Sequence, residues 1–200
     1  MRDDLIVDQA QRPSGIMGRM MGEVMAMTNR PRNKWLLAQL DLRPELNGLE
    51  FGFGNGETLG QFLAQSGGST ATGIDWSASM IDAAKANNRE ALASGHLSLK
   101  HGSITDPAFV LGGPYDRIWS SNVIQMVEDR PALFARLATA LNSGGLLALC
   151  FQPRGPKAPS PEMLAELCEA ELEATGFKKI ETRWMPNAKP KSFCILASSL

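Results

Sequence analysis

The sequence predicts an α/β fold in which a doubly wound, mostly parallel sheet carries helices on both faces. Two observations support this prediction. Short apolar runs alternate with stretches of helical periodicity from Gly48 to Thr175. The first of these runs also turns on closely spaced glycines directly into a helical pattern, which lets backbone approach a ligand at the helix N-terminus. Strands that alternate with helices form parallel pairs joined by crossover connections.

The composition indicates a globular protein of ordinary domain size. The chain has 200 residues, 44% of them hydrophobic, and a formal net charge of −1. Because this charge is close to zero, electrostatics give no argument for a nucleic-acid partner. The tightest basic group, Arg30, Arg32 and Lys34, is expected to be a solvated helix start. No apolar run reaches the length of a membrane span, so no membrane partner is expected.

Cysteine usage favours a reducing compartment. Cys150, Cys168 and Cys194 share no spacing typical of metal ligands or disulfides, and two of them lie inside apolar runs, where a small buried thiol is common. The N-terminus lacks a signal-peptide pattern. The sequence therefore predicts a cytoplasmic protein without a metal site.

Residues 1–44 are predicted to form an N-terminal tail and two helices. Methionines recur on one face of a helix over Ile16–Thr28, and a second helix is predicted to begin at Pro31 and to end near Pro44, with Trp35 and the leucines after it buried. Two interpretations of the methionine-rich helix remain open. It is either packed permanently on the core, or it is a lid whose methionines adapt to apolar ligands of varied shape.

Residues 45–200 are predicted to form the sheet and its helices. Strands are predicted over Gly48–Phe53, Ala71–Asp75, Leu97–His101, Arg117–Ser121 and Leu146–Phe151, and helices over Thr58–Gln65, Met80–Ala93, Ala132–Leu141 and Pro161–Thr175. Two further extended segments, Lys179–Trp184 and Ser192–Ala197, are predicted to form a closing hairpin. The segment from Asn142 to Gly145 is predicted to end a helix with a glycine in the left-handed conformation.

The most informative motif lies at the end of the first predicted strand. An acid, Glu50, is followed by Gly52, Gly54 and Gly56 at every second position. The dinucleotide fingerprint requires its third glycine three residues after the second, but Glu57 occupies that position. A glutamate would lie unfavourably against a pyrophosphate, so the motif indicates a nucleotide-like ligand other than a dinucleotide. A tight strand–helix turn without a ligand is the alternative.

This acid-x-Gly-x-Gly-x-Gly pattern resembles motif I of the class I S-adenosylmethionine-dependent methyltransferases. Three later segments resemble the same family in the same order: Gly73–Ile81 its second strand and the next helix start, Tyr115–Val123 its fourth strand, and Leu141–Leu149 its Gly-Gly turn and fifth strand. The resemblance implies a seven-stranded, Rossmann-like methyltransferase fold. It implies an N-terminal helical lid within residues 1–44 and an S-adenosylmethionine-binding domain over residues 45–200.

The resemblance also implies roles for individual residues around S-adenosylmethionine. Gly52, Gly54 and Gly56 would let the backbone pass against the methionine part of the cofactor, with Glu50 beneath it engaging the ammonium group. Asp75 would accept hydrogen bonds from both ribose hydroxyls, as an acid at this position does in dinucleotide sites. A helix cap is the alternative role for Asp75.

The adenine ring and the methyl group would meet residues further along the chain. Trp76 and Met80 would cover one adenine face and Ile104 the other, although core packing is an equal alternative for Met80. Ser103 stands where many relatives carry an aspartate that binds the adenine amino group, and a hydroxyl binds it more weakly than a carboxylate. Asn122 would direct its backbone carbonyl to the amino group of the cofactor.

No general base can be identified from the sequence. Gln125 and Met126 stand where many relatives carry histidines. Because the sulfonium is already an activated leaving group, methyl transfer needs chiefly alignment and desolvation. The sequence predicts a methyltransferase acting on a small molecule through nitrogen, sulfur or a carboxylate in preference to a hydroxyl. Two alternatives stay open: a nicotinamide-dependent oxidoreductase, which Glu57 disfavours, and a non-catalytic module that binds S-adenosylmethionine.

Overall fold

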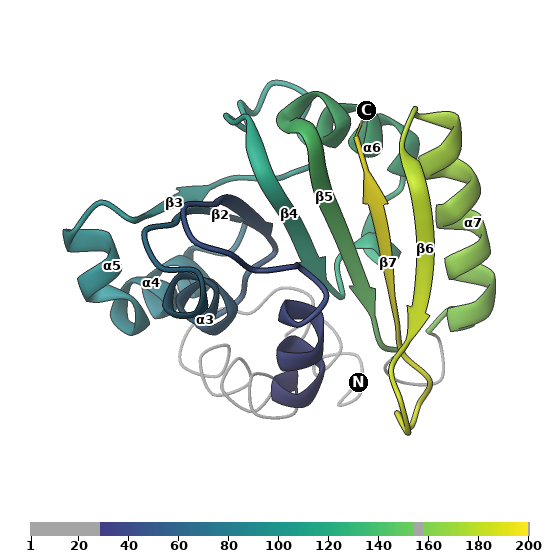
Figure 1. The fold of residues 1–200 in the computed structure, drawn as a ribbon, viewed down its shortest axis with the longest axis horizontal. Coiled ribbons are helices and arrows are strands. Elements are labelled where there is room, and N and C mark those ends of the chain that lie inside the picture. The colour runs from purple at the N-terminus through teal and green to yellow at the C-terminus, as the bar shows by residue number, and fades with distance from the viewer. Residues whose placement is uncertain (1–28, 154–157, 200) are drawn as a thin grey trace, which may run out of the picture.

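The computed structural model describes residues 29–153 and 158–199. Its centre is a seven-stranded sheet in the order β3-β2-β1-β4-β5-β7-β6 (Figure 1). The strands are β1 (Asn47–Phe51), β2 (Thr70–Asp75), β3 (Leu97–His101), β4 (Tyr115–Ser121), β5 (Leu141–Phe151), β6 (Lys178–Trp184) and β7 (Phe193–Ser198). The pairs from β3 to β5 are parallel, and β7 runs antiparallel to both of its neighbours. The predicted mostly parallel sheet with a closing hairpin is confirmed.

Helices cover both faces of this sheet. They are α3 (Glu57–Gln65), α4 (Ala78–Asn87), α5 (Arg89–Ala93), α6 (Arg130–Ala140) and α7 (Pro161–Ala174), together with a 3₁₀ turn η1 (Ile124–Met126). In Figure 1, α3, α4 and α5 gather beside β2 and β3, while α7 lies along β6. The helix predicted over Met80–Ala93 is interrupted at Asn88. The buried Asn88 amide donates hydrogen bonds to the carbonyl oxygens of Gly56 (3.1 Å) and Ala84 (3.0 Å).

Side chains of the central strands alternate between two apolar clusters, one on each face of the sheet. On β5, Leu147 and Leu149 pack with α6 and α7, whereas Ala148 and Cys150 pack with α3 and α4. A strand buried on both faces is a near-continuous apolar run, which is why the sequence predicts β5 clearly. Cys150 pairs with Cys194 in the register of β5 and β7, and the three cysteines are buried, free thiols.

The helix predicted to begin at Pro31 is described from residue 29 and ends at residue 37, before the predicted end near Pro44. Leu36 and Leu37 of this helix and Leu40 just after it are buried, as predicted. After the helix, the Arg117 side chain on β4 donates hydrogen bonds to the carbonyl oxygens of Leu40 and Asp41. These leucines share an apolar cluster with Phe62 of α3, so this helix and the sheet have one core.

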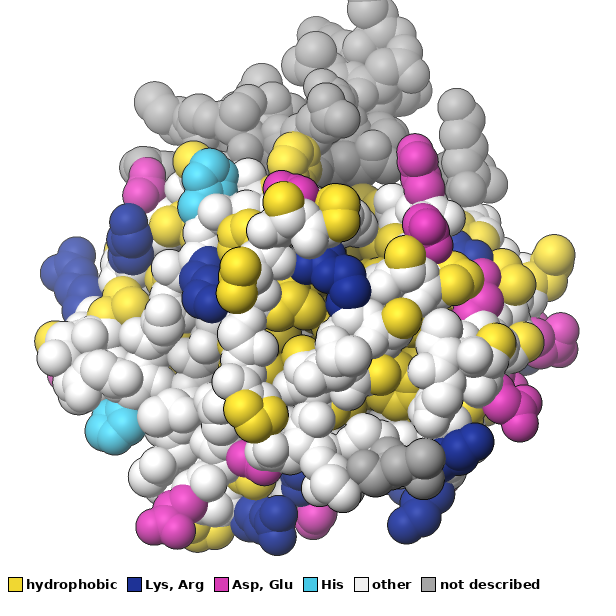
Figure 2. Space-filling view, turned by 90° about the horizontal axis from the view of Figure 1, so that it is seen from above, with side chains coloured by type: hydrophobic (Ala, Val, Ile, Leu, Met, Phe, Trp, Pro, Cys, Tyr) yellow, Lys and Arg dark blue, Asp and Glu magenta, His cyan; other side chains and the backbone are white. Residues whose placement is uncertain are grey.

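The methionine-rich helix predicted over Ile16–Thr28, and with it the lid, lies outside the described residues. The segment from Asn142 to Gly145 was expected to end the helix, but it lies inside β5, because α6 ends at Ala140 and β5 begins at Leu141. Gly144 has the predicted left-handed conformation, with a φ of 72°, and β5 bulges between the residues paired with Tyr115 and Arg117. Within the described ranges, no helix is both long and apolar enough to span a membrane. Figure 2 shows acidic and basic side chains interspersed over the face seen from above.

Candidate active site

A cavity of about 720 Å³ lies where the carboxyl ends of β1 to β4 meet the helix over residues 29–37. Ligands of open α/β sheets bind at this edge because the strand-to-helix loops converge there. Nine of the ten predicted cofactor residues line the cavity: Glu50, Gly52, Gly54, Asp75, Trp76, Met80, Ser103, Ile104 and Asn122. Gly56 is not among the lining residues.

The three motif glycines serve different purposes in the structure. All have a positive φ, which an L side chain rarely adopts. A Cβ on Gly54 would meet no atom within 4 Å, so this position faces open space beside the cavity. A Cβ on Gly52 would collide with a methyl of Val123, and one on Gly56 would lie 2.7 Å from Ala84. Gly54 therefore leaves room for a ligand, whereas Gly56 lets α3 pack closely on α4.

Asp75 joins the glycine turn to the start of α4. Its Oδ2 accepts a hydrogen bond from the Gly54 amide (3.0 Å) and its Oδ1 accepts one from the Ser77 amide (2.9 Å). Burial raises the pKa of Asp75, while these two amides act against the rise. Asp75 thus has the local backbone role that the sequence left as its alternative, but Ser77 is the N-cap residue of α4. An ionised carboxylate has about four acceptor sites, so capacity for a ligand remains.

Glu50 is a buried carboxyl group with an unsatisfied oxygen. Only 2% of the residue is exposed, and its Oε2 has no hydrogen-bond partner among the described residues. Burial raises the pKa of Glu50 well above its ordinary value; the neighbouring Trp119 indole offsets part of the rise, and Asp75 adds to it. The Nε1 of Trp119 nevertheless stays outside hydrogen-bonding geometry with any described acceptor. An orphaned buried acceptor is costly, and a cationic ligand in the cavity would satisfy it.

Asn122 follows β4 in a left-handed conformation, with a φ of 59°. Its amide donates to the Cys150 carbonyl (2.9 Å), and its Oδ1 accepts from the Gln152 amide (2.7 Å). The Asn122 carbonyl oxygen accepts a hydrogen bond from Nε2 of Gln125 (2.8 Å). Non-glycine residues in this conformation persist only where the surroundings hold them, and here β5 and η1 do so.

The remaining predicted residues form a less polar part of the cavity wall. Trp76 is 46% exposed, whereas Met80 and Ile104 are almost completely buried and also contribute to the core. The Ser103 hydroxyl lies 2.8 Å from the Thr105 hydroxyl, so it takes part in a local turn. The edge-strand residue His101 holds the Trp76 backbone through a contact of 2.9 Å between Nε2 and the carbonyl oxygen.

Arg32 was expected to be solvated, and that expectation is wrong. The residue is 2% exposed and lines the cavity. Its Nε donates to the Ser121 hydroxyl (2.9 Å) and its Nη1 to Oε1 of Gln152 (3.2 Å), so it reaches the ends of both β4 and β5. Helical spacing gave a signal that was missed: Arg32 lies four residues before Leu36, on the buried face of the helix.

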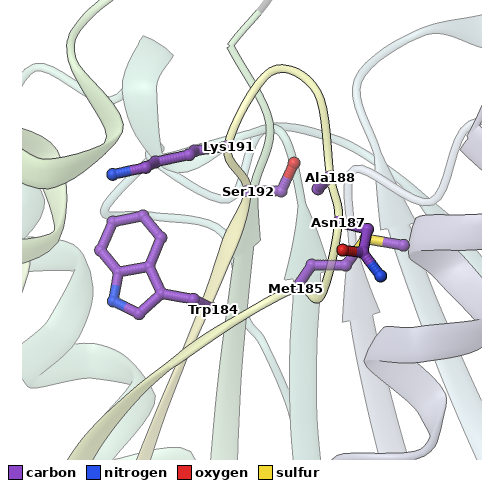
Figure 3. Close-up of a pocket in the computed structure, with 6 residues that line it drawn as sticks. All are labelled: Trp184, Met185, Asn187, Ala188, Lys191 and Ser192. Atoms are coloured by element: carbon purple, nitrogen blue, oxygen red, sulfur yellow. The ribbon is translucent and has the colours of Figure 1, made fainter.

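A second, smaller hollow of about 310 Å³ lies at the turn between β6 and β7 (Figure 3). Lys191 and Trp184 lie side by side in it, with the ammonium 5.8 Å from the ring centroid. The same ammonium pairs with Glu162 at 2.9 Å. None of the predicted site residues lines this hollow, so the larger cavity is the candidate active site.

Neither the sequence motifs nor the cavity includes a metal site: the described residues contain no group of three or more His, Cys, Asp or Glu side chains that could hold an ion. The titratable side chains of the cavity lining are Glu50, Asp75 and the exposed Glu128, together with Arg32. The described lining therefore contains three carboxylate side chains and no histidine, cysteine, lysine or tyrosine.

Comparisons with known proteins agree with this geometry. Residues 49–145 match the family model described as a methyltransferase domain. The uncharacterized methyltransferase YdaC of Bacillus subtilis is 32% identical over 181 residues, which cover 88% of this chain and 96% of the relative. Trans-aconitate 2-methyltransferase of Deinococcus radiodurans is 30% identical over 147 residues, 74% of this chain but only 54% of that relative. The chain thus spans about half of that enzyme's length.

Solved structures show the same fold at low identity. Phosphoethanolamine N-methyltransferase 2 of Haemonchus contortus, in complex with phosphomonomethylethanolamine and S-adenosylhomocysteine, has a TM-score of 0.75 at 15% identity and covers 97% of this chain and 59% of its own. An S-adenosylmethionine-dependent methyltransferase of Aquifex aeolicus has a TM-score of 0.67 at 16% identity, covering 84% and 89%. The sequence motifs, the sheet order and these relatives together show that the chain belongs to the class I S-adenosylmethionine-dependent methyltransferases.

Proposed function

We propose that this enzyme transfers the methyl group of S-adenosylmethionine to a small-molecule nucleophile held above the carboxyl ends of β4 and β5. The observation that carries this proposal is the buried, unsatisfied oxygen of Glu50 beside Gly54 and Asp75 in one cavity. These two carboxyl groups fit the cofactor as hydrogen-bond acceptors. The ammonium group of the cofactor can donate to the buried Glu50 carboxylate, and the ribose hydroxyls can donate to the remaining acceptor sites of Asp75. The proposed cofactor residues are Glu50, Gly52, Gly54, Gly56, Asp75, Trp76, Met80, Ser103, Ile104 and Asn122.

The positions of several of these residues support specific tasks. Gly54 leaves space for the amino-acid part of the cofactor, and Glu50 lies beneath that space. Gly56 acts indirectly, because it sets how α3 packs on α4. Trp76 is exposed enough to cover the adenine ring on one side, with Ile104 on the other. When bound, the cofactor supplies a methyl group on an activated sulfur, and the chain has to align the acceptor and exclude water.

The lining of the cavity supports an acceptor that needs no enzymic base. No side chain with an ordinary pKa near neutrality belongs to the described lining. A neutral amine, a thiolate or a carboxylate attacks the methyl group without proton removal by the protein, whereas an alcohol generally requires it. Two curated relatives are named for such acceptors, trans-aconitate and the nitrogen of phosphoethanolamine. Their names support, for this chain, a polar small molecule as acceptor.

The region before the sheet supplies the acceptor side of the cavity in this proposal. Its described helix contributes Asn29, Arg32 and Asn33 to the lining. Residues 1–44 then act as a tail and a lid, and residues 45–200 as the cofactor-binding domain, within one structural domain.

Calorimetry and a turnover assay test the proposal. S-adenosylmethionine and S-adenosylhomocysteine should bind with micromolar dissociation constants, on the order of −8 kcal/mol, and NADH should not bind. Release of S-adenosylhomocysteine should be measured with trans-aconitate, phosphoethanolamine and their close analogues as acceptors. Tight cofactor binding without turnover on any polar amine, thiol or acid would favour the alternative of a non-catalytic binding module.

A further inference from the structure

We infer that Gln125 binds the ammonium group of the cofactor through its amide oxygen, together with the Glu50 carboxylate. The inference rests on the proposed function and adds a residue to it. Gln125 lies in η1, directly after β4, and lines the same cavity as Glu50.

The orientation of the Gln125 amide is fixed by its neighbour. Nε2 lies 2.8 Å from the Asn122 carbonyl oxygen, and only the nitrogen end of the amide can donate to that oxygen. The amide oxygen, Oε1, therefore points to the other side. It is buried and has no hydrogen-bond partner among the described residues. Buried polar atoms are normally paired, so an orphaned acceptor in a cavity wall calls for a ligand that donates to it.

The support behind this amide is rigid. Asn122 is held in its left-handed conformation by two hydrogen bonds at the end of β5: its amide donates to the Cys150 carbonyl oxygen, and its side-chain Oδ1 accepts from the Gln152 amide. Gln125 is anchored in turn on the Asn122 carbonyl oxygen. Its amide oxygen is therefore preorganised before any ligand arrives, which reduces the entropy lost on binding.

The position of the Gln125 amide oxygen, and the donors that the cofactor carries, indicate that the ammonium group donates to this oxygen. Two buried orphaned acceptors line the cavity: Oε2 of Glu50 on β1, and Oε1 of Gln125 in η1, directly after the neighbouring strand β4. The ribose is proposed to lie at Asp75, on the far side of β1 in the sheet order. An ammonium carries three N–H donors, which equals the number of acceptors available to it: the two orphaned oxygens and a second lone pair of the Asn122 carbonyl.

Two probes separate this role from a structural one. S-adenosylhomocysteine carries the ammonium, whereas 5′-methylthioadenosine has the same adenosine and a thioether but no amino-acid group. In Gln125→Met, which keeps the length and removes the acceptor, the dissociation constant of S-adenosylhomocysteine should rise about tenfold or more, as expected for a hydrogen bond to a charged group. The dissociation constant of 5′-methylthioadenosine should stay within about twofold.

Two further variants make the result decisive. Gln125→Glu retains an acceptor oxygen and should recover part of the affinity for S-adenosylhomocysteine. Gln61→Met is a matched control, because the Gln61 amide bonds Glu57 on α3 and does not line the cavity. Thermal unfolding of the ligand-free variants checks that each is folded.

Three outcomes overturn the inference. Equal losses for both probes in Gln125→Met would mean a general disturbance of the site. Unchanged affinity for S-adenosylhomocysteine would mean that Gln125 does not contact the cofactor, including the case in which it contacts the methyl acceptor. A loss in Gln61→Met as large as in Gln125→Met would mean that the effect is not local. Failure of the wild-type protein to bind either probe would instead refute the proposed function.

Discussion

Replacing Glu50 with glutamine tests the electrostatics of the cavity most directly, because the variant keeps the shape of the side chain and removes its charge. Glu50 is 2% exposed, its Oε2 is unsatisfied, and burial raises its pKa well above the ordinary value of 4.5. The ligand-free protein therefore retains the proton on this carboxyl at pH values where an exposed glutamate has lost it.

The sign of the pH effect follows from this shift. Because the pKa of Glu50 is higher in the folded than in the unfolded state, the folded state binds more protons between the two values. The contribution to stability is complete below the unfolded pKa and is lost as pH rises through the folded pKa. Burial also raises the pKa of Asp75, which acts in the same direction and remains in the variant. Glu50→Gln should thus flatten the fall in stability toward alkaline pH without abolishing it.

Cofactor binding should reverse the preference of the Glu50 carboxyl group for its protonated form. A bound ammonium favours the ionised form, so binding at neutral pH should release a proton, and affinity should rise with pH until Glu50 is ionised. Removing one partner of a buried, hydrogen-bonded charge pair costs about 2–5 kcal/mol, equivalent to roughly 30- to 5,000-fold in affinity. Glu50→Gln should weaken S-adenosylhomocysteine binding within this range and reduce the release of protons.

Calorimetry in two buffers of different ionisation enthalpy gives both the affinity and the number of protons released. Glu57→Gln is the matched control, because Glu57 pairs with Arg30 at the start of α3 and does not line the cavity. Equal affinities of wild type and Glu50→Gln, with the same pH dependence, would show that Glu50 does not meet the ammonium. A variant that is less stable than wild type at mildly alkaline pH would refute the assignment of a costly buried carboxyl.

Three other perturbations follow from the same geometry. Asp75→Ala should weaken cofactor binding at least about tenfold, since it removes charge-assisted hydrogen bonds, and an unchanged dissociation constant would reduce Asp75 to its backbone role. Gly54→Ala and Gly144→Ala should each lose roughly 1–2 kcal/mol of stability in denaturant unfolding, because both positions have a positive φ and open space around them. Only Gly54→Ala should also weaken S-adenosylhomocysteine binding, and equal affinities of the two variants would contradict the close approach at Gly54. Deleting residues 1–28 should leave a folded protein that binds cofactor in calorimetry but no longer transfers methyl groups, whereas aggregation or unfolding would place the methionine-rich helix in the core.

Local patterns predicted the strands and most helices, and long-range contacts explain the errors. The strand over Leu97–His101 has its predicted bounds, because its short alternating pattern ends at Gly102. The interruption at Asn88 could not be predicted, since the Asn88 amide bonds the Gly56 carbonyl from 32 residues away. The packing of α4 also explains Gly56, because a Cβ there would meet Ala84 and Asn88 of that region.

The residues of the candidate site also fall into two groups: those that a local motif predicts and those that long-range contacts place. Glu50, Asp75 and Asn122 lie within one residue of a strand's carboxyl end or at it, so a motif in the sequence places them at the cavity. Arg32 and Gln125 reach the cavity from a helix and a 3₁₀ turn, and their places depend on which strand end those elements contact.

The residues outside the sheet bear on the choice of methyl acceptor. In the proposed site, the strand ends place the groups that meet the cofactor. The residues that approach from outside the sheet, among them Arg32 and Asn33, form the wall opposite those strand ends. A substitution there leaves the sheet and the glycine turn intact while it changes the charge and shape that an acceptor meets. We therefore expect variants of the helix over residues 29–37 to change acceptor choice without loss of cofactor affinity.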